Sequence, residues 1–478
     1  MEPQLERTRP SARGKYCVSQ SFVIPLRHME QFDVVVIGSG QGGVPFAVKM
    51  ARQGRSVCLF ESGPLGGTCV NNGCTPSKSF LASAHSAGRA RRAGTIGVHA
   101  DVTVDFPAVM RRVNGIIASF RDENEKRLRD AGVAIVRERA RFTAPNVVAG
   151  PHTEVTAPTI LINTGCSAAT PPIPGLDDVP HLTNETFFGL TELPQSFVVI
   201  GGGYIGLELG QGVARCGASV QIVEPADRVL SNEEPDVSDV LARSLRDDGI
   251  GLHLRARVER IRPHAGGVHV ELAGGTTLEA EGVLVATGRT PNTRDLQLQR
   301  AGIARDARGF IQVDDYLRTP VEGVYAIGDV AGQPQFTHVS WEDHRRVLST
   351  LHGTPRKRDD RTLAYAVFTE PQIGRAGLTF AQAEARGIDA RAETLPLAEV
   401  ARGIEWGDER GFFRAVVDRR TEALIGATFA GYEMGELIHV LLTYIQRGAT
   451  WHDLADAMHV HPTFAEGLPT LARKFASH

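Results

Sequence analysis

The pattern of hydrophobic residues predicts the same succession of elements twice along the chain: a short buried strand, a glycine-rich turn, a helix and a second strand. The first strand, residues 32–37, reads Phe-Asp-Val-Val-Val-Ile, a β-branched run typical of parallel strands that are covered on both faces. Residues 44–53 then have helical periodicity, and residues 55–61 predict the second strand. The second copy has its strand, helix and strand at residues 197–200, 207–216 and 219–224.

Both turns contain the spacing Gly-x-Gly-x-x-Gly, and both second strands end on a glutamate. The motif residues are Gly38, Gly40, Gly43 and Glu61 in the first copy and Gly201, Gly203, Gly206 and Glu224 in the second. Such glycines allow a tight turn and let the backbone approach a pyrophosphate at the helix N-terminus, while the acid accepts hydrogen bonds from a ribose. One copy would be weak evidence, but two copies predict two dinucleotide sites, most naturally for a flavin and a nicotinamide.

Composition excludes several other classes of protein. The 478 residues are 42% hydrophobic and 22% charged with a net charge of −3, which offers no electrostatic basis for binding nucleic acid or an anionic membrane. No run of about 18 apolar residues predicts a membrane span, and six cysteines are too few for a secreted disulfide framework. We therefore expect a cytoplasmic protein with neither a nucleic-acid nor a membrane partner.

Two cysteines lie close together in the segment Gly-Gly-Thr-Cys-Val-Asn-Asn-Gly-Cys-Thr-Pro-Ser-Lys, residues 66–78. Cys69 and Cys74 could not be bridged within a regular helix, because a rise of roughly 7.5 Å over five residues exceeds the usual ~4.4–6.8 Å between the Cα atoms of a disulfide. A bridge would need a break in the helix, which Gly67 and Gly73 would permit. Spacing alone leaves three alternatives open: a redox disulfide, two free buried thiols, or half of a zinc site, for which the other cysteines offer only isolated residues.

Residues 66–78 resemble the active-site signature of the class I pyridine nucleotide–disulfide oxidoreductases, which include dihydrolipoamide dehydrogenase, glutathione reductase and mercuric reductase. Three further segments resemble motifs of this family in the family's order, residues 286–292, 325–330 and 459–466. The resemblance extends over residues 32–471. It implies that Cys69 and Cys74 form a redox-active disulfide, and that two chains form a homodimer whose active site is shared between the subunits.

Pattern and resemblance together predict an α/β fold, with two Rossmann-like dinucleotide-binding domains, for FAD and NAD(P), and a C-terminal α+β dimerisation domain. The expected boundaries are residues 1–30 for an N-terminal extension, 31–170 and 291–361 for the two parts of the FAD-binding domain, 171–290 for the NAD(P)-binding domain and 362–478 for the dimerisation domain. Predicted elements of the last domain are strands at residues 364–368, 412–417 and 423–430 and a helix at residues 434–446. We interpret residues 1–28 as a loose extension, with a short targeting arm as the alternative.

The resemblance implies a path for electrons from NAD(P)H through FAD to the disulfide. Cys74 would be the sulfur next to the flavin, and Cys69 the interchange thiol that meets the substrate. His461 is the expected general acid–base, oriented by Glu466, because a histidine pKa near neutrality suits that role and a carboxylate partner raises its basicity. In the family this pair comes from the other subunit.

Further residues match positions that hold the cofactors in the family. Lys78 and Glu208 match an ion pair beside the flavin, although a lysine on a helix could simply be solvated. Asp329 is expected at the ribityl chain and Glu61 at the adenosine ribose. Tyr204 would cover the nicotinamide pocket, or serve only in packing. The remaining expected cofactor contacts are Gly67, Thr68, Thr164, Gly165, Gly288 and Arg289.

The second glutamate indicates which nicotinamide is used. Glu224 favours NADH, because a carboxylate accepts from a free 2′-hydroxyl and repels a 2′-phosphate. Arg228 is the only nearby cation and leaves NADPH possible. No resident metal site is expected, and His459, two residues before His461, is interpreted as structural.

The substrate is less determined, because the chain departs from each named relative. The last cysteine is Cys216, so the C-terminal cysteine pair of mercuric reductase is missing, while Asn72, Thr75 and residues 336–341 differ from the dihydrolipoamide dehydrogenase pattern. Three functions follow, in this order. The first is an NADH-dependent oxidoreductase acting on a small dithiol or disulfide such as lipoamide. The second is a reductase of a soft metal ion, Hg(II) or Cu(II), and the third is a component subunit of a 2-oxoacid dehydrogenase assembly.

Overall fold

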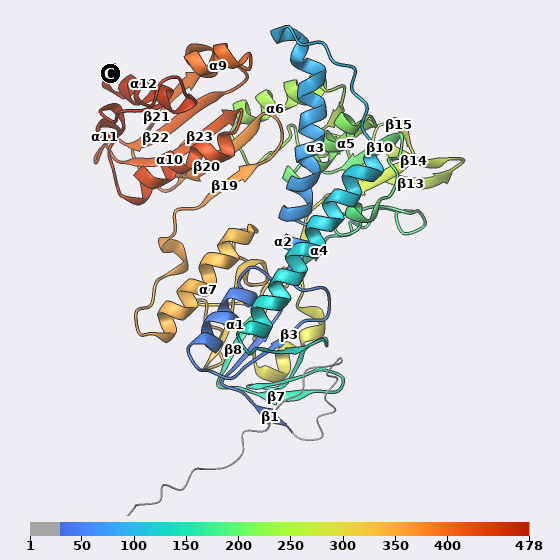
Figure 1. Cartoon of the computed structure of the whole chain (residues 1–478), viewed down its shortest axis with the longest axis vertical. Helices are drawn as coiled ribbons and strands as arrows, with labels where there is room; N and C mark the ends of the chain where they lie inside the picture. Colours follow the sequence, from blue (N-terminus) through green and yellow to red (C-terminus); the bar gives the residue numbers. More distant parts are fainter. Residues whose placement is uncertain (1–28, 478) are drawn as a thin grey trace, which may run out of the picture.

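The computed structural model describes residues 29–477 and is shown in Figure 1. The expected extension at residues 1–28, and with it the alternative of a targeting arm, lies outside the described residues. Within residues 29–477, no helix has the length and apolar character needed to cross a bilayer.

The first unit is built on a parallel sheet of five strands in the order β18-β8-β2-β3-β4. Its strands are β2 (Val34–Ile37), β3 (Val57–Phe60), β4 (Ala134–Val136), β8 (Thr159–Ile162) and β18 (Val324–Ala326). Every residue of β2 and β3 is buried, as their uninterrupted β-branched and apolar sequences predict. Because β18 follows the second glycine motif by more than a hundred residues, the chain leaves this sheet and later returns to complete it.

The two faces of this sheet are covered differently. Helices α1 (Gly43–Arg52), α4 (Phe106–Asp130) and α7 (Thr337–Leu351) pack on one face through an apolar cluster that includes Phe46, Leu128 and Val347. A mixed sheet in the order β1-β7-β6-β5, in which only β1 and β7 are parallel, packs on the other face through Phe142, Val148 and Val155. Its strands are β1 (Glu30–Gln31), β5 (Arg141–Ala144), β6 (Val147–Ala149) and β7 (Glu154–Thr156).

The central unit repeats the same three layers. Its parallel sheet has the order β12-β11-β10-β16, with α5 (Tyr204–Cys216) and α6 (Pro235–Asp247) on one face. The strands are β10 (Ser196–Ile200), β11 (Ser219–Glu224), β12 (Gly251–Leu254) and β16 (Gly282–Val285). An antiparallel sheet of β13 (Val258–His264), β14 (Gly267–Leu272) and β15 (Thr277–Ala280) covers the other face. A short antiparallel pair, β9 (Cys166–Ala168) with β17 (Arg289–Pro291), accompanies the passage between the units.

The C-terminal unit is a five-stranded antiparallel sheet in the order β19-β20-β23-β22-β21, covered by α10 (Met434–Gln446). The strands are β19 (Ala364–Val367), β20 (Gln372–Gly377), β21 (Ala390–Pro396), β22 (Phe412–Asp418) and β23 (Leu424–Gly431), and the shorter helices are α8 (Phe380–Ala385), α9 (Ala401–Trp406), α11 (Trp451–Ala455) and α12 (Gly467–Arg473). The three strands and the helix that were predicted for this unit are confirmed to within two residues. Sequence analysis missed β20 and β21, because glycines and charged residues interrupt their apolar pattern. The α/β fold with two Rossmann-like units and a C-terminal α+β unit is thus confirmed.

The segment with the two cysteines forms α2 (Gly67–Asn71) and α3 (Cys74–Arg92), which connect the three units. Figure 1 shows α3 and α4 as long neighbouring helices, of which α3 lies between the central and C-terminal units and α4 runs from the central unit to the first unit. One apolar cluster joins Phe80 of α3 to Val213 of α5 and to Ile373 of the C-terminal sheet. The position of α3 is therefore set by all three units together.

A buried group of charges reinforces this junction. Arg215 of α5, with a side chain only 2% exposed, contacts Glu370 in the loop before β20, and its guanidinium also donates to Asp248 at 2.9 Å. Arg92 of α3 donates to Glu370 at 2.9 Å, and Arg89 lies 3.2 Å from the same carboxylate. Burial by itself would raise the pKa of Glu370, but these three guanidinium groups outweigh it and hold the pKa at about 2.

Replacing Glu370 with glutamine should lower the free energy of unfolding by about 3–5 kcal/mol, because buried guanidinium groups lose their anionic partner. Urea denaturation at pH 7 measures this loss. The folded pKa of the carboxyl lies below the unfolded value of ~4.3, so its contribution is present above that pH and is lost as the pH falls towards about 2.

The acid side of the stability profile should accordingly be shallower in the Glu370→Gln protein than in the wild type. The exposed ion pair of Lys126 with Asp130 provides the control, and Asp130→Asn should leave the denaturation midpoint unchanged. Equal effects of the two substitutions would show that the buried charges do not stabilise the junction.

Candidate active site

The first glycine of each motif is required by backbone conformation and by a close contact. Gly38 has φ of +100° and Gly201 has φ of +114°, values that residues with a side chain rarely adopt. A Cβ atom at Gly38 would lie 2.5 Å from the carbonyl oxygen of Asn163, and one at Gly201 would lie 2.4 Å from that of Ala286. In both motifs the contact is with the residue that follows the neighbouring parallel strand, so both first glycines are required for the same steric reason.

The other motif glycines differ in what surrounds them. A Cβ at the third glycine, Gly43 or Gly206, would lie 2.1 Å from the carbonyl oxygen of the first glycine, which fixes the tight turn into the helix. At the middle position of the second motif, Gly203 has no atom of the described chain within 4 Å of its Cβ position. The missing side chain there leaves open space at a helix N-terminus, as a bound pyrophosphate requires.

The two motif glutamates hold their glycine loops by equivalent hydrogen bonds. Glu61 accepts from the backbone N–H groups of Ser39, at 3.0 Å, and of Gly63, at 2.9 Å. Glu224 accepts from those of Gly202, at 2.7 Å, and of Ala226, at 2.8 Å. Each acid thus bonds residues 22 positions before and two positions after itself, so the internal repeat extends to individual hydrogen bonds. Each carboxylate oxygen keeps further lone pairs for a ribose.

A cavity of about 860 Å³ is lined by both the first glycine loop and the segment that contains Cys69. The expected cofactor residues that line it are Gly38, Gly40, Glu61, Gly67, Thr68, Thr164, Gly165 and Asp329. Cys69 and Thr337 line the same cavity. Its volume and its polar glycine-rich wall fit a dinucleotide such as FAD. Arg289, also expected at the cofactor, forms an ion pair with Asp329 at 2.5 Å.

The two cysteines meet because the helix that carries them is broken. Helix α2 ends at Asn71, and Gly73 has φ of −129° and ψ of −114°, so that Cys74 begins a new helix. A Cβ on Gly73 would lie 2.8 Å from the carbonyl oxygen of Thr68, a second reason for glycine at the break. The interruption that a bridge between the cysteines would need is therefore present. Both cysteines are free thiols in this structure, and their side chains are hydrogen-bonded to each other.

The environment of the pair favours a thiolate on Cys74. The hydrogen bond from Cys69 lowers the pKa of Cys74 most, whereas burial raises this pKa. The Thr337 hydroxyl, 3.2 Å from Cys74 Sγ, and the charge of Lys78 lower the pKa further, and the result is a value of about 6. The pKa of Cys69 is raised, because Cys69 donates that hydrogen bond and is itself buried. No group of three or more metal-ligating side chains within residues 29–477 includes either cysteine, which leaves the zinc alternative without support.

Lys78 and Glu208 form the expected ion pair, with 2.7 Å between Nζ and Oε2. The Glu208 side chain is buried, and its other oxygen accepts from the backbone N–H of Phe368 at 2.9 Å. The Lys78 ammonium also lies 4.5 Å from the centre of the Phe368 ring. Lys78 is therefore held by specific partners, and the alternative of a freely solvated lysine is wrong.

His461 and Glu466 are also in contact, but they belong to the C-terminal unit and lie far along the chain from Cys69 and Cys74. Nδ1 of His461 lies 2.6 Å from Oε2 of Glu466, and the His461 side chain is 73% exposed. Met458 and Val460 beside it are exposed as well. No hydrogen bond or ion pair of the described chain joins His461 to either cysteine, so its catalytic role stays a prediction.

Tyr204 lies at the start of α5, where burial raises its pKa to about 12. Its ring centre is 6.0 Å from that of Phe336, which stacks in turn on Tyr365 at 4.6 Å. The tyrosine is thus the end of an aromatic group between the central unit and the strand that begins the C-terminal sheet. Its expected function as a cover for the nicotinamide stays a prediction.

Sequence analysis missed two polar residues of the site. Thr337 belongs to the segment at residues 336–341 that departs from the dihydrolipoamide dehydrogenase pattern, and this departure was the available signal. Asn163 is buried at the end of β8, where its side chain accepts from the backbone of Gly43 at 2.9 Å and donates to Ser340 at 2.9 Å. An asparagine directly after a buried strand was the corresponding signal.

Comparison with known proteins agrees with this geometry. The sequence profile described as pyridine nucleotide-disulphide oxidoreductase matches residues 32–343, and that of the family's dimerisation domain matches residues 363–472. Mercuric reductase of Bacillus cereus is 33% identical over 91% of this chain and 70% of its own length, and dihydrolipoyl dehydrogenase of Haloferax volcanii is 35% identical over 91% and 94%. The structure of the Cu(II) complex of the HOCl-induced flavoprotein disulfide reductase RclA from Escherichia coli has a TM-score of 0.84, with 34% identity over 93% of this chain and 99% of that one.

Replacing Thr337 with valine should raise the pKa of Cys74 from about 6 towards the ordinary thiol value near 8.5, because the thiolate loses a hydrogen-bond donor. The measurement is the rate of iodoacetamide alkylation against pH in the reduced protein, with the label located on Cys74 by mass spectrometry. Thr337→Ser keeps the hydroxyl and should restore the wild-type profile. An unchanged profile in Thr337→Val would show that the hydroxyl does not stabilise the thiolate.

Proposed function

Since the chain belongs to the pyridine nucleotide-disulphide oxidoreductase family, we propose that it passes electrons from NADH through FAD to Cys69 and Cys74 and on to a small disulfide of the lipoamide type. The observation that carries this proposal is the contact of the two thiols, one of which, Cys69, lines the cavity formed by the first glycine loop. Two thiols in contact can be oxidised to a disulfide and reduced again.

Residues of the first unit would hold FAD in this cavity. The backbone of Gly38 and Gly40 and the carboxylate of Glu61 form the end suited to the pyrophosphate and adenosine ribose. Asp329 and Cys69 line the same cavity. When bound, FAD supplies a two-electron relay between a nicotinamide and a disulfide. The ammonium of Lys78, held by Glu208, places positive charge beside Cys74.

The pKa values of the thiols explain why a base is needed. Cys69 meets the substrate, but its raised pKa keeps it protonated at neutral pH. His461 would take the Cys69 proton as the sulfur attacks the substrate disulfide, which forms a mixed disulfide, and would then give this proton to the first departing thiolate. The Cys74 thiolate next attacks Cys69 Sγ, which forms the Cys69–Cys74 disulfide and releases the second substrate thiolate. Two electrons thereby move from the protein to the substrate.

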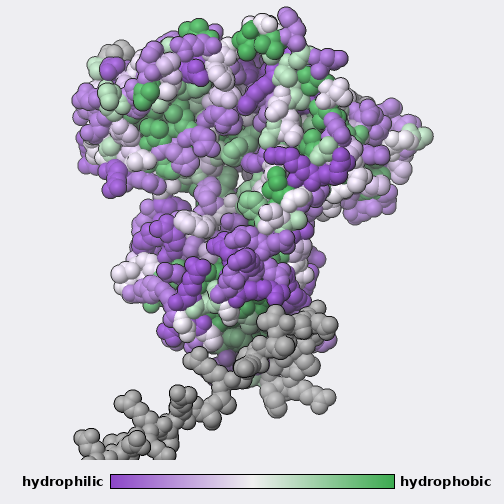
Figure 2. All heavy atoms as spheres, viewed as in Figure 1, coloured by the Kyte–Doolittle hydropathy of each residue, from purple (hydrophilic) through white to green (hydrophobic). Residues whose placement is uncertain are grey.

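This step supports a dimer in which His461 acts on the partner's cysteines. Residues 363–472 match the family's dimerisation domain, and His461 is exposed beside the apolar residues Met458 and Val460. Figure 2 shows hydrophobic residues gathered on the face of the C-terminal unit around α10. Apolar surface on this unit is suited to contact with a second copy of the chain.

The central unit supports NADH as the electron donor. Both oxygens of Glu224 are anchored at the second glycine loop by backbone N–H groups, so a negative charge is fixed where the adenosine ribose would lie. Arg228, the nearby cation, is engaged by Asp227 and by the carbonyl oxygen of Ser231, each at 3.2 Å. A 2′-phosphate would therefore meet a carboxylate that is already fixed in place.

A metal-ion reductase is the second candidate. Similarity to mercuric reductases and to the Cu(II) complex of RclA favours it. The Cys74 thiolate beside the Cys69 thiol also provides two soft ligands for Hg(II) or Cu(I). The two candidates use the same cysteines and differ in what receives the electrons.

Turnover of the purified flavoprotein should separate these candidates. We expect rapid NADH oxidation with oxidised lipoamide, slower oxidation with NADPH, and little with Hg(II) or Cu(II) in excess thiol. Cys69→Ser should retain FAD and lose disulfide turnover, while Cys58→Ser, which alters a buried thiol of the first sheet, should retain it. Fast metal-dependent oxidation with poor lipoamide turnover would favour the second candidate, and near-normal turnover of Cys69→Ser would contradict both.

Replacing His461 with alanine should slow the disulfide half-reaction by about 10²–10⁴-fold, the usual contribution of a general acid–base. Reduction of the flavoprotein by NADH should be nearly unchanged, because no thiol proton moves to a substrate in that step. Stopped-flow measurement of the two half-reactions tests this, with His459→Ala as the neighbouring control. Equal slowing of both half-reactions would contradict the acid–base role.

A further inference from the structure

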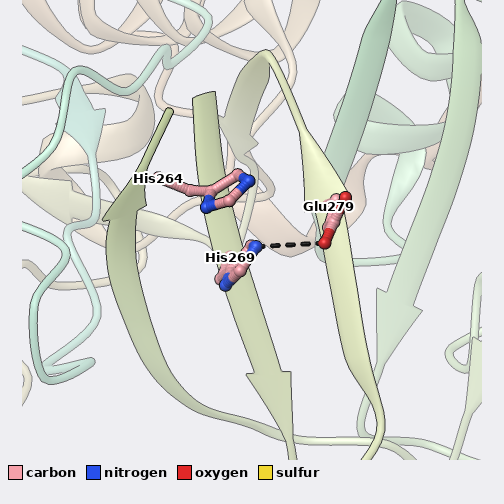
Figure 3. Close-up of side chains that lie close together, drawn as sticks. All are labelled: His264, His269 and Glu279. Carbon is pink, nitrogen blue, oxygen red and sulfur yellow. Dashed lines mark ion pairs between the residues drawn. The ribbon is translucent and has the colours of Figure 1, made fainter. Parts of the chain in front are cut away.

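Two histidines and a glutamate converge on the solvent-facing side of the sheet of β13, β14 and β15 (Figure 3). His269 lies directly opposite Glu279 on the neighbouring strand, and opposite Arg262 on the other side. His264 is two residues beyond Arg262 and therefore shares the face of His269. We propose that His264, His269 and Glu279 bind one divalent transition-metal ion of the borderline class, such as Zn²⁺ or Cu²⁺.

The ligand atoms are close enough for an ion with only side-chain rotation. One ligand atom of each residue lies within 4.8 Å of the other two. Ligands at about 2.1 Å from a tetrahedral zinc ion are about 3.4 Å apart, so no pair of ligand atoms has to close by more than about 1.4 Å. His264 and Glu279 are exposed and can turn, while the cross-strand pairing keeps their backbone positions fixed.

The present contacts leave a ring nitrogen without a satisfactory partner. Nε2 of His269 is buried and makes no hydrogen bond, although a carboxylate oxygen of Glu279 lies 3.1 Å away, because the direction of that contact is unfavourable. The rings of His264 and His269 stack with centres 3.9 Å apart, an arrangement that adds no hydrogen bond between them. A metal ion would give the buried nitrogen a partner and use the nearby carboxylate and second imidazole.

The surrounding charges permit a cation here. Arg262, which faces His269, is engaged by Glu271 at 2.9 Å, so its charge is already balanced. The opposite face of the sheet is apolar and packs against the central unit through Ile261, Val268 and Val270. The site is thus held on a rigid support.

The donor set selects the kind of ion. Two imidazole nitrogens and one carboxylate oxygen suit Zn²⁺, Cu²⁺ and Ni²⁺, and are a poor match for Ca²⁺ or Mg²⁺, which prefer oxygen ligands. Three protein ligands leave one position for water or another small ligand. The three residues differ from the redox pair, so this site would bind metal whatever the substrate of the cysteines is.

Metal binding to the full-length flavoprotein carrying Cys69→Ser and Cys74→Ser, which removes competition from the thiols, tests the proposal. Calorimetric titration with Zn²⁺ should give one ion per chain with Kd below about 10 µM. Cu²⁺ at the same stoichiometry should show electron paramagnetic resonance splitting from two nitrogen ligands. His269→Ala, His264→Ala and Glu279→Gln should each weaken binding by at least about 10-fold.

The exposed pair of His452 with Glu422, 3.2 Å apart, supplies the control, because it has one imidazole and one carboxylate but no second histidine. His452→Ala should leave the affinity unchanged. Unchanged flavin content and circular dichroism would show that each variant is folded, and Glu279→Gln keeps the side-chain shape should either alanine variant fail to fold. Absence of binding, or binding equally strong in the three site variants, would overturn the proposal.

Discussion

A two-residue break between α2 and α3 places the two reactive sulfurs in contact. A continuous helix would separate the Cα atoms of Cys69 and Cys74 by roughly 7.5 Å along its axis, whereas the conformation at Gly73 starts a second helix in a new direction. The hydrogen bond between the thiols and the lowered pKa of Cys74 both follow from this break. Cys69 of this pair lines the same cavity as the first glycine loop.

The helix that begins at Cys74 is in turn fixed by contacts with all three units. Lys78 pairs with Glu208 of the central unit, and Arg92 pairs with Glu370 at the C-terminal sheet. Phe80 lies in the apolar core that these units share. The positions of Cys69 and Cys74 relative to both glycine loops are therefore fixed. A movement of either neighbouring unit would shift the thiols relative to the cavity. The same helix serves for chemistry and for assembly of the fold.

Much of the fold could be predicted from the sequence, because its strongest signals are local. The glycines at positions 38 and 201 are required by positive φ and by a neighbouring carbonyl group, so they reveal the turn wherever it occurs. The buried strands that flank them have uninterrupted apolar sequences, as in β2. In contrast, β20 contains Gly374, Arg375 and Gly377 and owes its conformation to pairing with β19 and β23, which no local pattern shows.

The sequence by itself determined the two dinucleotide motifs, the cysteine pair with glycine between its members, and the resemblance that assigned the ion pair of Lys78 and the histidine at position 461. Only the tertiary structure brought Thr337, 263 positions away in the chain, into contact with Cys74, where its hydroxyl helps to lower the pKa of that thiol. It also brought His264, His269 and Glu279 together across three strands. Covalent neighbours set backbone conformation, but pKa values and ligand sets depend on side chains that only folding brings within a few ångströms.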